Sequence, residues 1–282
     1  MKVLCGSSSK SLATDLAEKL ETVCIQATTK RFPDSEGYVR IEEESLDKEI
    51  VIVQNTYPDS NLVELFLIQD AARALGAEKI TTVVPYFGYG RQDRRFNPGE
   101  ALSAQVMLKH LAVDTDRLFT IDLHKPDILR WFTKPGAKDI TATTAIGNFF
   151  AHNDVDLVLA PDKGASQRAA EVAHVLGCAT DHLTKTRLSG SEVVIQPSRL
   201  DAKGKTVLIV DDIISTGGTI FAATNELKRI GAKKVFAVCT HGLFIGGALD
   251  KLRTVCDRVI STNTLENEVS EISVAKEVAK AI

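Results

Sequence analysis

The chain contains one strand–helix–strand plan twice, and this repeat limits the folds open to it. In each copy a short apolar strand leads through a loop to a helix, a Gly-Ala-x-Lys corner and a second apolar strand; the copies span residues 50–84 and 207–239. Glycine at a helix end stops the helix, and the apolar run after it starts a strand. Strands that alternate with helices are typical of a parallel sheet covered by helices. We therefore expect an α/β protein with two related halves, although helix–glycine–strand corners are common and the likeness could be coincidental.

The second copy carries an acidic, hydroxyl-rich loop directly after its first strand. The run Val207–Val210 is too short for a helix and rich in β-branched residues, so it suits a central strand of a parallel sheet. Two acids follow it, Asp211 and Asp212, and then the loop residues Ser215, Thr216, Gly217, Gly218 and Thr219. Open α/β sheets bind ligands at the carboxyl ends of their strands, and the next helix points its positive end at the same place.

This order of residues predicts a pocket for a phosphorylated sugar. The hydroxyls and the closely approaching glycine amides suit a phosphate. The ionised acids only accept hydrogen bonds, so vicinal sugar hydroxyls or a bridging magnesium ion would suit them. An acidic turn without a ligand is the alternative. The first copy lacks this chemistry, because it has Gln54 and Asn55 in place of the acids and Tyr57–Asn61 in place of the loop.

Composition excludes several classes of protein. The 282 residues are 44% hydrophobic and 25% charged, which is ordinary for a globular protein. With a net charge of -3 the chain has no global attraction to nucleic acid or membrane, so neither is expected as a partner. The five cysteines are odd in number and widely separated, which indicates neither a disulfide framework nor a zinc site. A cytoplasmic location is expected.

We place the division between the halves within residues 140–146, after the turn Lys134–Gly136. This gives an N-terminal domain of residues 1–142 and a C-terminal domain of residues 143–265. Val274, Val278 and Ile282 recur at helical spacing. Residues 266–282 are therefore expected to form an amphipathic helix that packs back on the first half.

Two further strand exits carry polar residues. A strand ending at Leu159 opens into Ala160–Ala165, whose Asp162 and Lys163 suit a metal ion and phosphate oxygens. A plain turn is equally compatible with this segment alone. His124 ends the run Ile121–His124 at another strand exit, where it could bind a ligand or serve as an ordinary hydrogen-bonding partner.

Three other segments are each compatible with a solvated loop or with binding. Arg91, Arg94 and Arg95 follow a strand, and guanidinium groups suit phosphates and stack on purines. The turn Phe32–Gly37 offers an aromatic face and two acids that suit adenine. The segment Leu183–Ser191 has the composition of a mobile cationic flap.

Taken in order, six segments resemble the ribose-phosphate pyrophosphokinase family, and the resemblance covers nearly the full chain. The segments are Phe32–Glu36, Arg91–Arg95, Asp122–His124, Pro161–Gly164, Lys185–Arg187 and Asp211–Thr219. The resemblance implies two phosphoribosyltransferase-type domains, each with a central, mostly parallel sheet flanked by helices. It also implies transfer of the diphosphoryl group of ATP to the C1 hydroxyl of ribose 5-phosphate, with Mg²⁺ as cofactor. The products would be 5-phosphoribosyl 1-pyrophosphate and AMP, and the expected assembly is a homodimer or larger.

The resemblance also implies a role for each matching residue. Lys185 and Arg187 would be catalytic, and His124 and Asp162 would contact magnesium, although Mg²⁺ prefers oxygen ligands. ATP would be bound by Phe32, Asp34, Ser35, Glu36, Arg91, Gln92 and Asp93. Ribose 5-phosphate would be bound by Arg187, Asp211, Asp212, Ser215, Thr216, Gly217, Gly218 and Thr219. The chain departs from many members of the family at Ser215, where they have an acid, and at Ser35, where they have glycine.

Two other functions fit parts of this pattern. A phosphoribosyltransferase that consumes phosphoribosyl pyrophosphate would use the Asp211–Thr219 loop, but it would not need the Phe32 and Arg91 segments. A non-catalytic regulator that senses phosphoribosyl pyrophosphate is the other alternative, and the presence of Lys185 and Arg187 argues against it.

Overall fold

The computed structural model describes residues 1–187, 193–197 and 202–282, and for residues 184–187 and 193–197 it describes the backbone alone. The chain divides into two compact units. The first comprises Met1–Thr141, Thr264–Glu266 and Ser273–Ile282, and the second comprises Ala142–Asn263 and Asn267–Ile272. The break between Thr141 and Ala142 lies one residue before the expected one.

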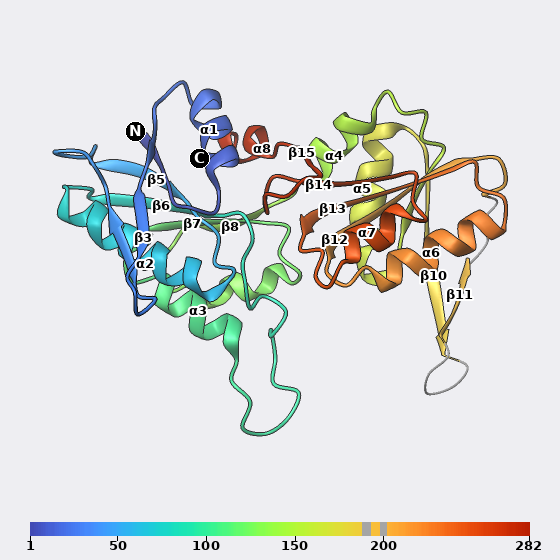
Figure 1. The fold of residues 1–282 in the computed structure, drawn as a ribbon, viewed down its shortest axis with the longest axis horizontal. Helices are drawn as coiled ribbons and strands as arrows, with labels where there is room; N and C mark the ends of the chain where they lie inside the picture. The colour runs from blue at the N-terminus through green and yellow to red at the C-terminus, as the bar shows by residue number, and fades with distance from the viewer. Residues whose placement is uncertain (188–192, 198–201) are drawn as a thin grey trace. The chain divides into compact units, whose positions relative to one another are not determined.

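The first unit is built on a six-stranded sheet in the order β2-β1-β5-β6-β7-β8, in which all neighbouring strands are parallel. Figure 1 shows α1 and α8 on one face of this sheet and α2 and α3 on the other. β3 and β4 form a separate antiparallel hairpin that contacts α2. The elements are β1 (Lys2–Cys5), α1 (Lys10–Lys19), β2 (Cys24–Gln26), β3 (Thr28–Arg31), β4 (Gly37–Arg40), β5 (Glu49–Val53), α2 (Asp59–Ala74), β6 (Lys79–Val84), α3 (Ser103–Leu111), β7 (Arg117–Ile121), the 3₁₀ helix η1 (Pro126–Trp131), β8 (Ala137–Ile140) and α8 (Ala275–Ala279).

The second unit has a seven-stranded sheet in the order β11-β10-β9-β12-β13-β14-β15. Its strands are parallel except for the hairpin pair β10 and β11. In Figure 1, α4 and α5 lie on one face of the sheet, and α6 and α7 lie on the other. The elements are α4 (Thr143–Phe150), β9 (Leu157–Ala160), the 3₁₀ helix η2 (Lys163–Ala165), α5 (Ser166–Leu176), β10 (Ala179–Arg187), β11 (Val193–Pro197), β12 (Thr206–Ile214), α6 (Gly218–Arg229), β13 (Lys234–Gly242), α7 (Ala248–Arg253), β14 (Arg258–Thr262) and β15 (Ser270–Ile272).

The central strands explain why both sheets are covered on two faces. β5 reads Glu-Ile-Val-Ile-Val, and all of it except Glu49 is buried. The run Val207–Val210 in β12 is buried in the same way. A strand without a polar face has to be covered on both sides, and β-branched side chains fit such a surface. The expected fold class, two α/β domains with parallel sheets, is confirmed.

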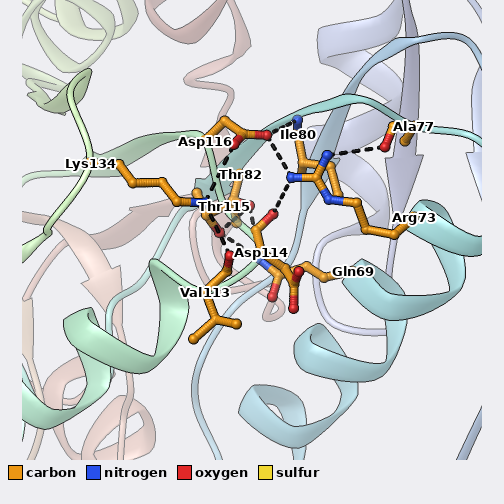
Figure 2. Close-up of polar contacts among 10 residues, drawn as sticks. All are labelled: Gln69, Arg73, Ala77, Ile80, Thr82, Val113, Asp114, Thr115, Asp116 and Lys134. Atoms are coloured by element: carbon orange, nitrogen blue, oxygen red, sulfur yellow. Dashed lines mark hydrogen bonds and ion pairs between the residues drawn. The ribbon is translucent and has the colours of Figure 1, made fainter.

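The repeat extends to the edge of each sheet where its strands begin. In the first unit the Asp116 carboxylate accepts a hydrogen bond from the Ile80 amide at 2.8 Å and pairs with Arg73 at 2.6 Å (Figure 2). In the second unit Asp257 accepts from the Val235 amide at 2.8 Å and pairs with Lys228 at 3.5 Å. Each acid thus joins the start of one strand to the helix before it.

Two expectations about the elements are wrong. The tail 266–282 is not one helix, because Ser270–Ile272 pairs with β14 as a strand of the second sheet and the helix α8 is limited to Ala275–Ala279. The strand expected to stop at Val210 continues to Ile214, because Asp211, Ile213 and Ile214 keep their pairing with β13. No helix in the described ranges is both long and apolar enough to cross a membrane.

Candidate functional site

The loop after β12 has the backbone geometry expected of a phosphate loop. It consists of Ser215–Gly217, and α6 starts at Gly218. Gly217 has φ 69°, a left-handed conformation that favours glycine, and a Cβ there would lie 3.1 Å from Leu252. A Cβ on Gly218 would meet open space, and Thr216 and Gly218 are exposed. The first amides of the 12-residue helix α6 therefore adjoin an open loop, which is an arrangement suited to anions.

Two carboxylates precede this loop within β12. An Asp211 oxygen accepts from the Asp212 amide, and an Asp212 oxygen accepts from the Ile213 amide, both at 2.9 Å. Burial raises the pKa of the Asp211 carboxyl well above its usual value, and the charges of Asp212 and Asp162 raise it further. The strand exit thus concentrates acceptor oxygens that hydroxyl groups or a cation would stabilise.

Asp162 belongs to the neighbouring strand exit, because β9 pairs with β12 in the same sheet. One oxygen of Asp162 accepts from the amides of Gly164 at 2.8 Å and Ala165 at 3.2 Å. Asp162 therefore caps the start of η2 with its own side chain.

Lys185 and Arg187 lie two residues apart in β10, which pairs with β9 on one side and β11 on the other. Their side chains lie outside the described part of the structure. The flap expected at Leu183–Ser191 is described only as far as Arg187, because residues 188–192 lie outside the described ranges.

In the first unit the turn Phe32–Glu36 joins the two strands of the hairpin. The Phe32 ring is 43% exposed and packs edge-on against Tyr38, with 5.8 Å between ring centroids. Asp34 accepts from the Glu36 amide at 3.1 Å, and both acids are exposed. Ser35 has φ 75°, a left-handed conformation that glycine adopts more readily than serine does.

The basic segment follows β6 in a loop organised by Glu100. The Glu100 carboxylate accepts from the Asn97 side chain at 2.5 Å and the Phe96 amide at 2.7 Å. The Asn97 contact is the main cause that lowers the pKa of Glu100. Gln92 donates to the Arg94 carbonyl at 3.1 Å, while Arg91 is exposed and Asp93 is half-buried.

His124 is exposed and lies between β7 and η1 in the first unit, whereas Asp162 belongs to the second unit. Asp122, two residues before His124, is buried with φ 43°. Across the described residues, no three His, Cys, Asp or Glu side chains gather into a group that could hold a metal ion.

The sequence did not predict which side chains contact the loop that follows β1 in the first unit. The loop after β1 reads Gly6-Ser7-Ser8-Ser9, and Glu64 accepts from the amide and hydroxyl of Ser7 at 2.6 and 2.8 Å. A Cβ on Gly6 would lie 2.3 Å from the Gln54 side chain. The signal was a glycine–serine loop between an apolar strand and a helix. Its occupation by Glu64 and Gln54 depends on contacts between residues distant in the sequence.

The sequence identified Asn55 only as a residue that stands where the second copy has an acid. The structure shows that its side chain bridges several loops by hydrogen bonds. Its side-chain nitrogen donates to the carbonyls of Thr264 at 2.9 Å and Ser8 at 3.2 Å. Its side-chain oxygen accepts from the Tyr86 amide at 2.7 Å. Asn55 therefore joins the loops after β1, β5 and β6 to the C-terminal segment of the first unit.

Two family models match successive parts of the chain. Residues 134–275 match the family model of the phosphoribosyl transferase domain, and residues 1–113 match the model of the N-terminal domain of ribose phosphate pyrophosphokinase. Ribose-phosphate pyrophosphokinase from Pyrococcus abyssi is 42% identical over 286 residues, covering 99% of this chain and 98% of the relative. The Pyrococcus furiosus protein of the same name is 43% identical, with 97% of each chain covered.

The crystal structure of phosphoribosylpyrophosphate synthetase from Mycobacterium smegmatis superposes with a TM-score of 0.83 at 28% identity. The match covers 99% of this chain and 96% of that one. The class of protein defined by fold and loops is therefore a double phosphoribosyltransferase-type domain. The chain belongs to the ribose-phosphate pyrophosphokinase family, which confirms the resemblance drawn from the sequence.

Proposed function

We propose that the chain transfers the diphosphoryl group of ATP to the C1 hydroxyl of ribose 5-phosphate. The oxygen on C1 forms a bond to the β-phosphorus, the bond from that phosphorus to the α–β bridging oxygen breaks, and AMP leaves. The hydroxyl proton is released. The observation that carries the proposal is the order of groups at the β12 exit: two acids, a hydroxyl–glycine loop and the N-terminus of α6.

The β12 exit is the proposed acceptor site. Ser215–Thr219 would bind the 5-phosphate through hydroxyls and backbone amides. Asp211 and Asp212 would accept hydrogen bonds from the ribose hydroxyls. The open space beside Gly218 supports this assignment because it lets a phosphate approach the backbone closely, and the left-handed φ of Gly217 shapes the loop that leads to it. Binding of the sugar hydroxyls would also offset the burial and the repulsion from Asp212 that raise the pKa of Asp211.

The first unit supplies the proposed ATP site. The exposed Phe32 ring would stack on adenine, and the acids that flank Ser35, Asp34 and Glu36, would accept from its amine. Arg91, Gln92 and Asp93 would contact the remainder of ATP, with the Arg91 guanidinium on phosphate oxygens. The rival transferase that consumes phosphoribosyl pyrophosphate would need none of these groups.

Mg²⁺ is the proposed cofactor. This ion is usually held by one or two carboxylates together with substrate phosphates and water, so it does not need a cluster of three protein ligands. Asp162, Asp211 and Asp212 place carboxylate oxygens at two neighbouring strand exits, and the raised pKa of Asp211 indicates a place where a cation is favourable. When bound, the ion would offset the negative charge of phosphate oxygens. We assign contacts to Asp162 and, directly or through water, to His124.

Lys185 and Arg187 are the proposed catalytic residues. Phosphoryl transfer depends on in-line positioning and on offsetting the negative charge that spreads in the transition state. Cationic groups on β10 would supply that charge without forming a covalent intermediate. We also propose a cytoplasmic homodimer or larger assembly; the five free cysteines are compatible with a reducing compartment.

The deciding experiment mixes the purified protein with Mg²⁺, ATP and ribose 5-phosphate and follows all products. The expected result is AMP in a 1:1 ratio to phosphoribosyl pyrophosphate. Release of ADP, or no phosphoribosyl pyrophosphate across a range of Mg²⁺ and phosphate concentrations, would refute the proposal. Asp212→Asn should raise the KM for ribose 5-phosphate about tenfold or more, as expected for loss of a charged hydrogen-bond acceptor. The control Asp250→Asn, an exposed acid in α7, should leave it unchanged.

A further inference from the structure

Tyr89 is held in a backbone conformation that large side chains rarely adopt. Its φ is 66°, in the left-handed region, and it lies between Gly88 and Gly90 in the loop after β6. A non-glycine residue stays in this region only when its surroundings hold it there, and such positions cluster at functional sites. The Tyr89 side chain is 39% exposed, so packing alone does not hold this backbone conformation.

The Tyr89 hydroxyl supplies a specific restraint. It donates a hydrogen bond of 2.7 Å to Asp59 Oδ1, and Asp59 is the first residue of α2. The positive end of α2 stabilises a carboxylate at this position, so Asp59 is a well-placed acceptor. The contact joins the start of α2, where the loop after β5 ends, to the loop after β6, and it raises the pKa of Tyr89.

The same two loops are also fastened at their base. The Gly88 amide donates to the Thr56 hydroxyl at 2.7 Å, and the Thr56 amide donates to the Tyr86 carbonyl at 3.3 Å. A Cβ on Gly88 would lie 2.8 Å from the Thr56 carbonyl oxygen, so the backbones are in close contact. With the base fixed, the direction of the rest of the loop depends on the residues that follow Gly88.

The backbone of Tyr89 leads directly into the proposed ATP-binding residues. The Gln92 amide donates to the Tyr89 carbonyl at 3.0 Å, which closes a turn around Gly90 and Arg91. The conformation of Tyr89 therefore sets where Arg91 and Gln92 begin. We propose that Tyr89 and Asp59 form a tether that positions Arg91 and Gln92 for ATP, which makes Tyr89 a positioning residue for the diphosphoryl donor.

This proposal rests on the ATP-binding role proposed above for Arg91 and Gln92, and the test separates the two. Tyr89→Phe removes only the hydroxyl. It should raise the KM for ATP, and the Kd for ATP measured calorimetrically, about 3- to 10-fold, which is the range for one lost hydrogen bond. The KM for ribose 5-phosphate and kcat should stay within about twofold, because the proposed acceptor site is in the other unit.

Two Asp59 variants complete the test. Asp59→Ala should reproduce the effect of Tyr89→Phe, and the double variant should be no worse than either alone, because both remove the same contact. Asp59→Asn keeps Oδ1 as an acceptor and should restore the Kd for ATP to within about twofold of the wild-type value. Melting temperatures of all variants show whether each is folded.

Three outcomes would overturn the tether. The first is an unchanged Kd for ATP in Tyr89→Phe. The second is additive effects of Tyr89→Phe and Asp59→Ala in the double variant. The third is an equal loss of affinity for ATP and for ribose 5-phosphate that parallels a fall in melting temperature. If the wild-type protein binds ATP but makes no phosphoribosyl pyrophosphate, the proposed function fails while the calorimetric test of the tether stands.

Discussion

Replacing Asn55 tests why the first unit has an amide where the second has an acid. The Asn55 side chain is 1% exposed and satisfies the buried Tyr86 amide and the buried Thr264 carbonyl. Asn55→Ala removes three hydrogen bonds of this side chain, to the Thr264 and Ser8 carbonyls and from the Tyr86 amide. Each contributes about 1 kcal/mol, so the unit should lose roughly 3 kcal/mol of stability. For a domain of this size that lowers Tm by about 6–12 °C.

Asn55→Asp is the sharper variant because it is nearly isosteric. It keeps an acceptor for the Tyr86 amide but places a second oxygen against the carbonyls of Thr264 and Ser8. An acceptor that faces two acceptors is repelled, and the buried charge has no cation among these partners. We expect Asn55→Asp to destabilise the first unit at least as much as Asn55→Ala at pH 7, and less at pH 4, where the carboxyl gains a proton.

The assay is calorimetric unfolding together with hydrogen exchange of the Tyr86 amide, which reports on the first unit. Asn61→Ala is the matched control, because its side chain makes a single 2.7 Å bond, to the Tyr57 carbonyl at the surface. It should cost less than about 1 kcal/mol. If Asn55→Asp is as stable as wild type, or if the Tyr86 amide keeps its protection from exchange, the role assigned to Asn55 is wrong.

Three further predictions concern the proposed sites. Ser35→Gly should stabilise the hairpin by about 0.5 kcal/mol, because relief of the left-handed φ outweighs the added flexibility of the unfolded chain. Ser35→Val should destabilise the hairpin. Hydrogen exchange of the Phe32 and Glu36 amides measures both effects. The folded pKa of Asp211 is raised, so its contribution to stability is present below the unfolded pKa and lost as pH rises through the folded one. Ligand-free Asp211→Asn should therefore melt a few degrees above wild type at pH 7 and bind ribose 5-phosphate more weakly, and equal melting curves between pH 4 and pH 8 would contradict this. Lys185→Ala should lower kcat by about 10³-fold while the Kd for ribose 5-phosphate changes little, and parallel losses would place Lys185 in ground-state binding.

Much of the fold could be predicted from local pattern. The central strands are continuous apolar runs, and the glycine corners mark the helix ends, so the order of elements and the parallel sheets follow from short stretches of sequence. The prediction of one helix over residues 266–282 was wrong because it also rested on local pattern alone. Val274, Val278 and Ile282 have helical spacing, but Ser270–Ile272 gains a partner strand in β14, and pairing across the sheet is invisible to a local pattern.

Some features of the candidate site could likewise be predicted from neighbouring residues, and others could not. The Asp211–Thr219 string identified its loop because the acids, hydroxyls and glycines are adjacent in the chain, and the family resemblance located the ATP-side segments. The occupation of the Gly164 and Ala165 amides by Asp162, and of the Ser7 loop by Glu64, could not be read from composition. Those contacts depend on which side-chain rotamers reach which amides once the strands are side by side.

The two α/β halves, the acidic strand exit and the unequal chemistry of the two copies follow from the order of residues, because each depends on residues that are neighbours along the chain. The left-handed conformations of Gly217 and Ser35 and the hydrogen bond from Tyr89 to Asp59 arise only in the folded chain. So does the hydrogen bond from Asn55 to Thr264, 209 residues away in the chain. Backbone angles and long-range hydrogen bonds are set when distant segments pack together and every buried polar group must find a partner.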